Sequence, residues 1–417
     1  MKRLIRIILL ASFGLTSSYA QQFDYFVEEW DAAVIETNDS WRVDAESQGY
    51  YTIVEATTEK VHSGARAFKA QLYNPFKIFK RAELEHKYKA QIGEQYFYRF
   101  SVYLPSINGP VNYQDGLTFE LIAQWHGNPD FSLGETWRSP NLGFYMNQEG
   151  NLKITTRASD LPVNDNGTCL YVAHQDGNGN DFFAIPKDQW VTFEVSVRWD
   201  WTANGFLDIW MDGEQIVQYD GLTSYNDAVG PYMKLGLYRT TWVTDLHVAY
   251  YDNLQILKNG AIIFPDRDTF VRGGTYENDN YGYNGTLIVK HNNSPYYLRQ
   301  AYMHFDYSQY SAYSFSGADL LLNLSQSTTY DLLKVHRTGD AWSESQLTYA
   351  SAQSLPVYAY QGSGDAFLAT CLVPIPQAPS LGEISLRLSF DVHDAFIACR
   401  AREYSVLTER PMLLLRF

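Results

Sequence analysis

The feature that most constrains the fold is a succession of short extended segments separated by turn residues, from Phe23 to about Leu257. Phe97–Leu104 alternates between apolar and polar side chains, as a strand with one buried face does. Residues 206–217 are predicted to form two strands joined by Asp212-Gly213, and Asp-Gly is one of the strongest short hairpin signals. We find no long stretch of helical periodicity. Many short strands joined by turns predict an all-β jelly roll or sandwich.

The length of 417 residues exceeds what one hydrophobic core usually serves, so two domains are expected. The first is predicted to cover residues 21–258 and to be a β-jelly roll, a concanavalin-like sandwich. Further extended segments, such as Leu298–Asp306, predict a second β-sandwich over residues 262–417. Residues 164–181 are rich in Asn, Asp and Gly and are expected to form a long loop.

The first twenty residues have the pattern of a secretory signal peptide. Lys2, Arg3 and Arg6 make the start basic, Ile7–Leu15 is mostly apolar, and Ser18–Ala20 provides the small residues of a cleavage site. The apolar run is too short to span a membrane, and no later stretch is long enough to do so. We therefore expect a mature chain that begins at Gln21 and is secreted or periplasmic, without membrane insertion.

The formal net charge of −15 argues against nucleic acid and against an anionic membrane surface as partners. It does not exclude an acidic polymer, because the local charge in a cleft can oppose the global sign. Tyr, Phe and Trp make up 16% of the chain, which suits sugar binding as well as core packing. An acidic polysaccharide therefore stays possible as the partner of this chain, which we expect to be a monomer.

The three cysteines exclude a disulfide scaffold, and no pair of them has zinc-site spacing. Cys371 and Cys399 both lie in the C-terminal part and could pair in an oxidising compartment. Cys169 would then be left alone.

Three segments of the first domain carry polar side chains on one strand face, because alternate residues of a strand point to the same side. The predicted faces are Arg81, Glu83 and Glu85 in residues 80–85; Glu120, Ile122, Gln124 and His126 in residues 118–130; and Lys234, Gly236 and Tyr238 in residues 232–239. Gly236 has no side chain and would leave room between its two neighbours for a polymer that lies against the strand.

This combination of residue types fits β-elimination from a uronic acid. The reaction requires that the carboxylate be neutralised, that a base take the C5 proton and that an acid protonate the departing glycosidic oxygen. Arg81, Gln124 and Lys234 can supply positive charge and hydrogen bonds to the carboxylate. His126 can act as the base, because its unperturbed pKa is about 6.5.

Tyr238 can act as the acid, because an unperturbed pKa of about 10 keeps its proton in place at neutral pH. Lys234 and Arg239 are expected to lower this pKa, and Arg239 is also predicted to bind substrate. A tyrosine with a lowered pKa could instead take the C5 proton itself, in a syn elimination.

Each of these residues also has a purely structural interpretation. His126 can be a buried histidine at a loop edge, and Arg81 can simply pair with Glu83 or Glu85. Among other functions, a non-catalytic glycan-binding or adhesion protein is the main alternative. A jelly-roll glycoside hydrolase fits less well, because the set lacks that enzyme's paired carboxylates. A Ser-His-Asp arrangement with a nucleophile elbow is also missing.

At these residues the first domain resembles the heparin lyase I family of polysaccharide lyases, which is similar to jelly-roll glucuronan and ulvan lyases. The motifs are Lys80–Leu84, Gln124–His126 and Lys234–Tyr238. The resemblance implies that the histidine is the base, that the lysine and tyrosine of the third motif are catalytic, and that the arginine of the first binds substrate. Among glucuronan, ulvan and heparin or heparan-type chains, a less sulfated uronan is favoured, because the sequence has no dense basic run.

The second domain resembles the DNRLRE type of carbohydrate-binding domain, through residues 268–282, Trp342–Glu344 and Arg402–Glu403. The resemblance implies binding of an acidic polysaccharide. It does not assign the binding residues, and Tyr276 and Trp342 can equally belong to the core.

Residues 61–69 and 249–256 resemble the first and closing strands of many carbohydrate-active jelly rolls. The resemblance implies a structural calcium ion near the closing-strand aspartate. Asp252 is the candidate ligand here, with Glu28 as a second carboxylate. Calcium takes six to eight oxygen ligands, and the alternative is that Asp252 is a turn residue at the end of a strand.

Overall fold

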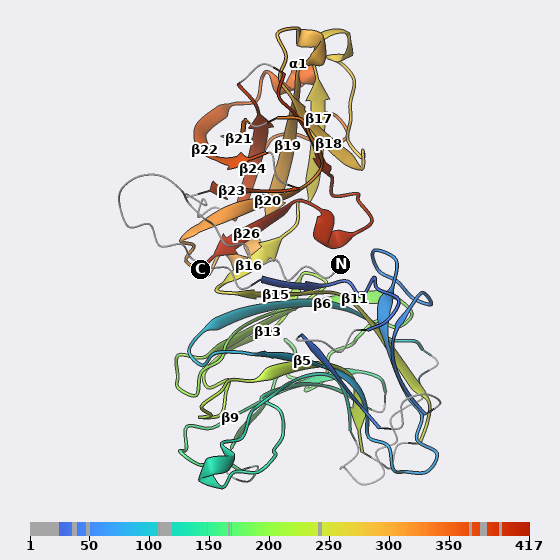
Figure 1. Ribbon diagram of the computed structural model, residues 1–417. Coiled ribbons are helices and arrows are strands. Elements are labelled where there is room, and N and C mark those ends of the chain that lie inside the picture. Colours follow the sequence, from blue (N-terminus) through green and yellow to red (C-terminus); the bar gives the residue numbers. More distant parts are fainter. Residues whose placement is uncertain are drawn as a thin grey trace. The chain divides into compact units, whose positions relative to one another are not determined.

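The structure, a computed structural model, describes residues 25–35, 40–46, 51–106, 108, 119–147, 149–165, 167, 169–240, 244–329, 331–366, 369–375, 382–391 and 394–417. The predicted signal peptide and Gln21 lie outside these residues. The chain forms two compact units, Met1–Asn259 and Gly260–Phe417 (Figure 1). The predicted all-β fold is confirmed. Within the described residues the α-helical conformation is limited to α1 (Tyr349–Ala352), and no helix there is long and apolar enough to cross a membrane.

The first unit contains two antiparallel sheets. One of them runs in the order β13 (Glu214–Asp220), β12 (Phe206–Met211), β11 (Trp190–Arg198), β6 (Gln95–Tyr103), β15 (His247–Lys258), β4 (Ala67–Leu72) and β3 (Thr52–Thr57), and β1 (Tyr25–Glu28) also pairs with β15. The predicted hairpin is present in it, because β12 and β13 pair directly across the Asp212-Gly213 turn.

The second sheet runs in the order β10 (Leu170–Ala173), β9 (Leu152–Ala158), β8 (Leu142–Met146), β7 (Glu120–His126), β14 (Tyr232–Arg239), β5 (Arg81–Lys89) and β2 (Trp41–Ala45). A short 3-10 turn, η1 (Phe131–Leu133), follows β7. Strand β10 corrects the prediction of one uninterrupted loop over residues 164–181, since it pairs with β9 from Leu170 to Ala173.

Aromatic side chains from both sheets form the core between them. Phe144 of the second sheet packs against Phe100 and Phe193 of the first, with ring centroids 6.2 and 5.2 Å apart. Trp125 of β7 joins them 5.6 Å from Phe144. Because one face of each sheet is buried in this way, the opposite face of the second sheet is free to carry polar residues.

The second unit is a sandwich built from one continuous chain of paired strands. Their order is β16 (Gly260–Ile263), β26 (Met412–Arg416), β20 (Gly317–Ser327), β25 (Phe396–Arg400), β18 (Thr286–Lys290), β19 (Arg299–Asp306), β24 (Glu383–Ser389), β21 (Leu332–Thr338) and β22 (Val357–Asp365). In addition, β17 (Arg267–Arg272) pairs with β19, and β23 (Thr370–Ile375) with β20. The remaining short 3-10 turns are η2 (Gly274–Tyr276), η3 (Pro295–Tyr297), η4 (Ser308–Tyr310) and η5 (Leu407–Glu409).

Trp342 belongs to the core of this unit, where it packs with Val271 and Tyr302. Its indole N–H donates to Ser385 at 3.1 Å. Tyr276, by contrast, is exposed. The structure therefore distinguishes two residues that the sequence left equivalent.

No disulfide joins Cys169, Cys371 and Cys399, all of which lie in the described part of the chain. Cys371 and Cys399 are buried on β23 and β25, and burial raises the pKa of the Cys399 thiol. The disulfide that the sequence left open is not formed.

Candidate active site

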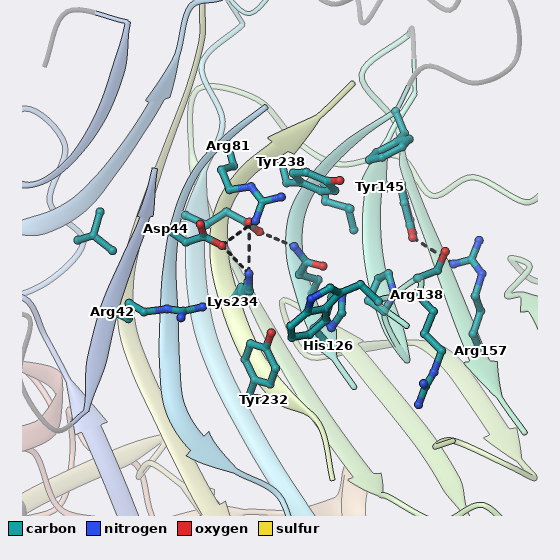
Figure 2. A pocket seen from close by; sticks show the side chains of 18 residues that line it. Arg42, Asp44, Arg81, His126, Arg138, Tyr145, Arg157, Tyr232, Lys234 and Tyr238 are labelled. Atoms are coloured by element: carbon teal, nitrogen blue, oxygen red, sulfur yellow. Dashed lines mark hydrogen bonds and ion pairs between the residues drawn. The ribbon is translucent and has the colours of Figure 1, made fainter. Parts of the chain in front are cut away.

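A polar pocket lies on the outer face of the second sheet, with a volume of about 810 Å³ (Figure 2). Strands β2, β5, β7 and β14 contribute most of its side chains. Five of the residues predicted from the sequence line it together: Arg81, Gln124, His126, Lys234 and Tyr238. Residues that are up to 157 positions apart in the chain thus form one site.

Strand register explains this convergence. Lys234 of β14 is directly opposite Gln124 of β7 on one side and Glu85 of β5 on the other. Tyr238 is opposite Arg81 of β5. Because directly opposite residues of an antiparallel pair project to the same side, each row of partners presents its side chains together.

The register of β7 corrects one part of the predicted pattern. Gln124 and His126 share the pocket face as expected, but Leu121 lines the pocket with them. Ile122 is in the hydrophobic core, and Glu120 is buried. The cause is an irregularity in the pairing of β7 with β8 between Leu121 and Ala123, which reverses the alternation at that point.

Gly236 lies where β14 loses register with β7. Its φ of +132° is a conformation that L side chains rarely adopt, and a Cβ there would collide with the carbonyl oxygen of Ala82. The glycine is therefore required for close approach of β14 to β5. This reason differs from the predicted one, which was space for substrate.

Carboxylates neutralise the cations on the β5 side of the pocket. Asp44 of β2 accepts from Lys234 Nζ at 2.7 Å and from Arg81 at 2.9 Å. Burial opposes ionisation of Asp44, but Lys234 and Arg81 outweigh it and lower the pKa of this carboxyl. Lys234 Nζ also lies 3.4 Å from Glu85. The partner predicted for Arg81 was Glu83 or Glu85; Asp44 holds that place.

Glu83 positions Gln124. The amide Nε2 of Gln124 donates to Glu83 at 2.5 Å, which leaves the Gln124 amide oxygen without a hydrogen-bond partner in the described part of the chain. Burial raises the pKa of Glu83, although Lys234 acts against the shift. A carboxyl that is readily protonated can hold the amide in either orientation.

The imidazole of His126 is held in one tautomer. Its Nδ1 lies 2.9 Å from the carbonyl oxygen of Gly127, so Nδ1 carries the proton and Nε2 has a free lone pair. Burial lowers the pKa of His126 to about 4, and Lys234, Arg138 and Arg81 contribute to the decrease. The ring is consequently neutral at neutral pH and able to accept a proton, although its basicity is lower than expected from the sequence.

The phenol of Tyr238 keeps its proton more firmly than predicted. Burial raises its pKa, and the guanidinium of Arg81, 4.9 Å from the ring centroid, only partly offsets this. A phenol that is protonated at neutral pH can donate to a leaving group. Lys234 also acts to lower the pKa, as the sequence suggested.

Arg239 does not reach the pocket. Its side chain is fully buried, paired with Glu120 at 3.4 Å, and it donates to the backbone carbonyl oxygens of Leu72 and Asp245. This arrangement corrects the predicted substrate contact. Residues 238 and 239 are neighbours on one strand, so their side chains point to opposite sides of the sheet.

Several of the residues that line the pocket were not singled out by the sequence, among them Trp137, Tyr145, Arg157 and Tyr232. Trp137 is 62% exposed and stacks edge-on with His126 and Phe131, at 5.5 and 5.3 Å between ring centroids. Arg157 donates to the Tyr145 hydroxyl at 3.2 Å.

The loop that carries Trp137 is anchored by a buried ion-pair network. Arg138 donates to Glu135 at 2.8 Å and also pairs with Asp227. Glu135 in turn accepts from the backbone N–H groups of Asp130 and Asn164. The acids are satisfied by these partners, so the network fixes the loop at the pocket rim.

The two carboxylates predicted as calcium ligands, Glu28 and Asp252, have different hydrogen-bond partners, and the calcium ion itself stays a prediction. Glu28 is remote from this role, because its carboxylate accepts from Trp30 N–H and Trp41 Nε1 at 3.1 and 2.9 Å. Its neighbour Glu29 is the residue that shares a site with Asp252.

Asp252 and Glu29 are linked through Ser63. Asp252 accepts from the Ser63 N–H at 3.1 Å, and Glu29 accepts from the Ser63 hydroxyl at 2.6 Å. Burial raises the pKa of Asp252 to about 7, with Glu29 as the next cause. Two buried carboxylates that disfavour each other's charge in this way fit a cation held between them.

Comparison with known proteins now identifies the family. The family described as polysaccharide lyase matches residues 32–255, which is more than half of the chain. The chain belongs to the polysaccharide lyase family. It is therefore an enzyme, and neither of the two other classes considered, a binding protein or a glycoside hydrolase. The finer resemblance to heparin lyase I stays a prediction.

The second unit of this polysaccharide lyase matches carbohydrate-binding module family 96 over residues 261–363. The chain thus combines a lyase domain with a carbohydrate-binding module. The more specific DNRLRE assignment stays a prediction. No curated protein matches the chain.

Solved structures resemble the polysaccharide lyase only distantly. An endo-β-1,4-glucuronan lyase from the fungus Trichoderma reesei is 18% identical, with 55% of this chain and 94% of that chain covered and a TM-score of 0.44. Cellulose induced protein, Cip1, is 14% identical, with coverages of 55% and 96% and a TM-score of 0.38. The marine alginate lyase AlyA1 from Zobellia galactanivorans is 12% identical, with coverages of 56% and 100% and a TM-score of 0.36. At this distance, the substrate has to be argued from the pocket itself.

Proposed function

We propose that this polysaccharide lyase cleaves a uronic-acid polymer by β-elimination in the pocket of the second sheet. One observation carries the proposal: a fixed histidine tautomer, a protonated tyrosine and a lysine–arginine–glutamine group all line that pocket. Elimination needs a proton acceptor, a proton donor and neutralisation of a carboxylate, and these side chains supply one each.

In the proposed reaction, the uronate carboxylate lies against Lys234, Arg81 and Gln124. Their charge and hydrogen bonds stabilise the enolate that develops when the C5 proton leaves. His126 Nε2 accepts that proton. The electron pair of the C5–H bond forms the C4–C5 double bond, the C4–O bond breaks, and Tyr238 protonates the departing oxygen. The products are a chain with a new reducing end, which keeps the protonated oxygen, and a chain whose new non-reducing end is an unsaturated uronate.

The syn alternative assigns both proton transfers to Tyr238. It requires a phenolate at the start of the reaction, and burial disfavours that form. The free Nε2 of His126 needs no prior ionisation. We therefore propose His126 as base and Tyr238 as acid.

The charges of the pocket favour a substrate with one carboxylate per uronate and few sulfates. Lys234, Arg81 and Arg42 pair with Asp44 or Glu85. Arg157 makes no such pair with a carboxylate within the described residues. A densely sulfated chain needs many unpaired cations. Glucuronan and lightly sulfated ulvan are accordingly proposed ahead of heparin-type chains.

We further propose that the lyase is exported by its signal peptide and carries a structural calcium ion. The ligands would include Asp252 and Glu29, and the ion would offset the repulsion between these buried acids. Its effect would be on the stability of the sandwich, far from the proton transfers.

The experiment is incubation of the purified chain with glucuronan, ulvan, heparin, heparan sulfate and alginate, followed by the ultraviolet absorbance of unsaturated uronates. We expect the absorbance to rise fastest with glucuronan or ulvan. No rise with any uronan would refute the proposal, whereas a rise with heparin alone would refute only the argument from charge.

A further inference from the structure

A row of three cations crosses the carbohydrate-binding module at the ends of neighbouring strands. Arg272 is the last residue of β17, Arg299 the first of β19 and Lys290 the last of β18. Arg272 is the register partner of Arg299, and Arg299 is the register partner of Lys290. Direct partners in a sheet have Cβ atoms about 5 Å apart, so the three side chains begin at adjacent positions on β17, β19 and β18. These three strands are neighbours in the ribbon (Figure 1).

These three cations lack the acidic partners that others in the module have. Lys334 pairs with Asp391, and Arg400 pairs with Glu409. Across the described residues, none of the three in the row makes an ion pair, and the Nε atom of Arg272 is buried without a hydrogen-bond partner. Burial lowers the pKa of Arg299, and Arg272 lowers it further. The chain has many acidic residues and a net charge of −15. Even so, no carboxylate of the described residues neutralises the positive charge of this row by an ion pair.

Exposed tyrosines border the row. The guanidinium of Arg272 lies 3.5 Å from the ring centroid of Tyr276, and Lys290 Nζ lies 5.1 Å from that of Tyr297. Tyr276, Tyr296 and Tyr297 are 38%, 50% and 49% exposed. Such rings offer apolar faces to the C–H groups of a sugar while their hydroxyls stay wet.

Glycines bring the two tyrosine turns together. The N–H of Gly273 donates to the carbonyl oxygen of Leu298 at 3.0 Å. Gly274 has a φ of +71°, and a Cβ there would come within 2.7 Å of Tyr296 Cα. The 3-10 turns η2 and η3 therefore meet beside the row, and the aromatic side chains are held there by the backbone.

We propose that Arg272, Arg299 and Lys290, together with Tyr276, Tyr296 and Tyr297, form the glycan-binding face of the module, and that its ligand is a carboxylated polysaccharide. Guanidinium groups bind carboxylates through paired charge-assisted hydrogen bonds. Sugar rings pack on the tyrosines between successive carboxylates. The assignment rests on the charges and rings of this face and is independent of the lyase pocket.

The test measures retention of the full chain in gels that contain polyglucuronate, in a Tyr238→Phe background so that the polymer is not consumed. We expect Arg272→Gln with Arg299→Gln to weaken retention roughly tenfold or more. The matched control is Lys334→Gln with Arg400→Gln, which removes the same charge from cations that already have carboxylate partners, and it is expected to retain the parental affinity.

Three results would overturn the assignment: unchanged retention of the Arg272/Arg299 variant, equal loss in the control, or stronger retention by a sulfated galactan without uronates. Cleavage of a short soluble uronan by Arg272→Gln/Arg299→Gln with an intact Tyr238 serves as the folding control and should equal that of the unaltered chain. Tyr297→Ala provides a charge-neutral second test and should also weaken retention. If no uronan is cleaved but retention still depends on the row, the proposed reaction fails and this assignment stands.

Discussion

The lyase pocket and the cationic row of the binding module treat positive charge in opposite ways. In the pocket, Lys234 and Arg81 share the carboxylate of Asp44. In the row, Arg272 and Arg299 have no carboxylate within ion-pair distance among the described residues. Burying a cation without a counter-ion is unfavourable in free energy. An enclosed site therefore needs carboxylates of the protein itself beside its cations. In a half-exposed row, a carboxylate of the ligand can act as the counter-ion instead.

The largest expected effect is on kcat and should leave binding to the polysaccharide nearly unchanged. Tyr238→Phe removes the proposed proton donor and is expected to reduce kcat by roughly 10²- to 10⁴-fold, with little change in retention on polyglucuronate gels. Tyr145→Phe, in the same pocket, is the matched control and should keep most of the activity. Full activity of Tyr238→Phe would eliminate its role as acid and leave the family assignment intact.

The second prediction concerns stability and sharpens the contrast directly. Lys234→Met leaves Asp44, Glu83 and Glu85 without their shared buried cation and should lower the free energy of unfolding by about 3–5 kcal/mol. Lys153→Met, which breaks a partly exposed pair with Asp181, should cost less than about 1 kcal/mol. Denaturant unfolding measures both.

In the same unfolding assay, the cationic row should behave differently. Arg272→Gln removes one of the three like charges in the row and is expected to leave stability unchanged or slightly higher. If it destabilises the chain as much as Lys234→Met does, the two sites do not differ in the way described.

The pH dependence of cleavage forms the third prediction. His126 accepts a proton only while neutral, and its pKa is lowered to about 4. The rate should therefore stay constant down to about pH 4 and decrease roughly tenfold for each pH unit below it. Because burial raises the pKa of Tyr238, the alkaline decrease should begin at a higher pH than the ionisation of an ordinary tyrosine would give. A decrease centred near pH 6.5 would contradict the burial of His126; the initial rate on a soluble uronan measures it.

The smallest expected effect is on KM and concerns the exposed aromatic residues at the pocket rim. Trp137→Ala removes a ring at the pocket rim and is expected to raise KM roughly fivefold with little change in kcat. Phe131→Ala, which removes only the ring that supports Trp137, should act in the same direction and more weakly. Tyr297→Ala should leave KM on short oligosaccharides unchanged. A decrease in kcat for Trp137→Ala would indicate instead that the indole positions His126.

Strand periodicity was sufficient to predict the all-β fold and to group five of the side chains that line the pocket. Arg81, Gln124, Lys234 and Tyr238 lie on strands whose alternation is regular at those positions. Alternation failed for Glu120 and Ile122, because an irregularity in register depends on the partner strands. Alternation also places Arg239 on the opposite face of the strand from Tyr238. The predicted substrate contact of Arg239 was therefore inconsistent with strand alternation.

Features that depend on distant parts of the chain were not predictable from local pattern. Asp44 pairs with Lys234 across 190 residues, and the Glu83–Gln124 contact spans 41. The choice between Glu28 and Glu29 depends on which carboxylate the turn at Trp30 directs toward Ser63. Likewise, the lowered pKa of His126 follows from burial, which one sequence does not reveal.

The most direct test of the account is to run the cleavage in water labelled with heavy oxygen and to analyse the product ends by mass spectrometry. Elimination at the pocket predicts unsaturated uronate ends, lighter by one water and without label, and at least about a hundredfold less product from Tyr238→Phe in the same time. Saturated ends that carry heavy oxygen would show hydrolysis and would contradict the account.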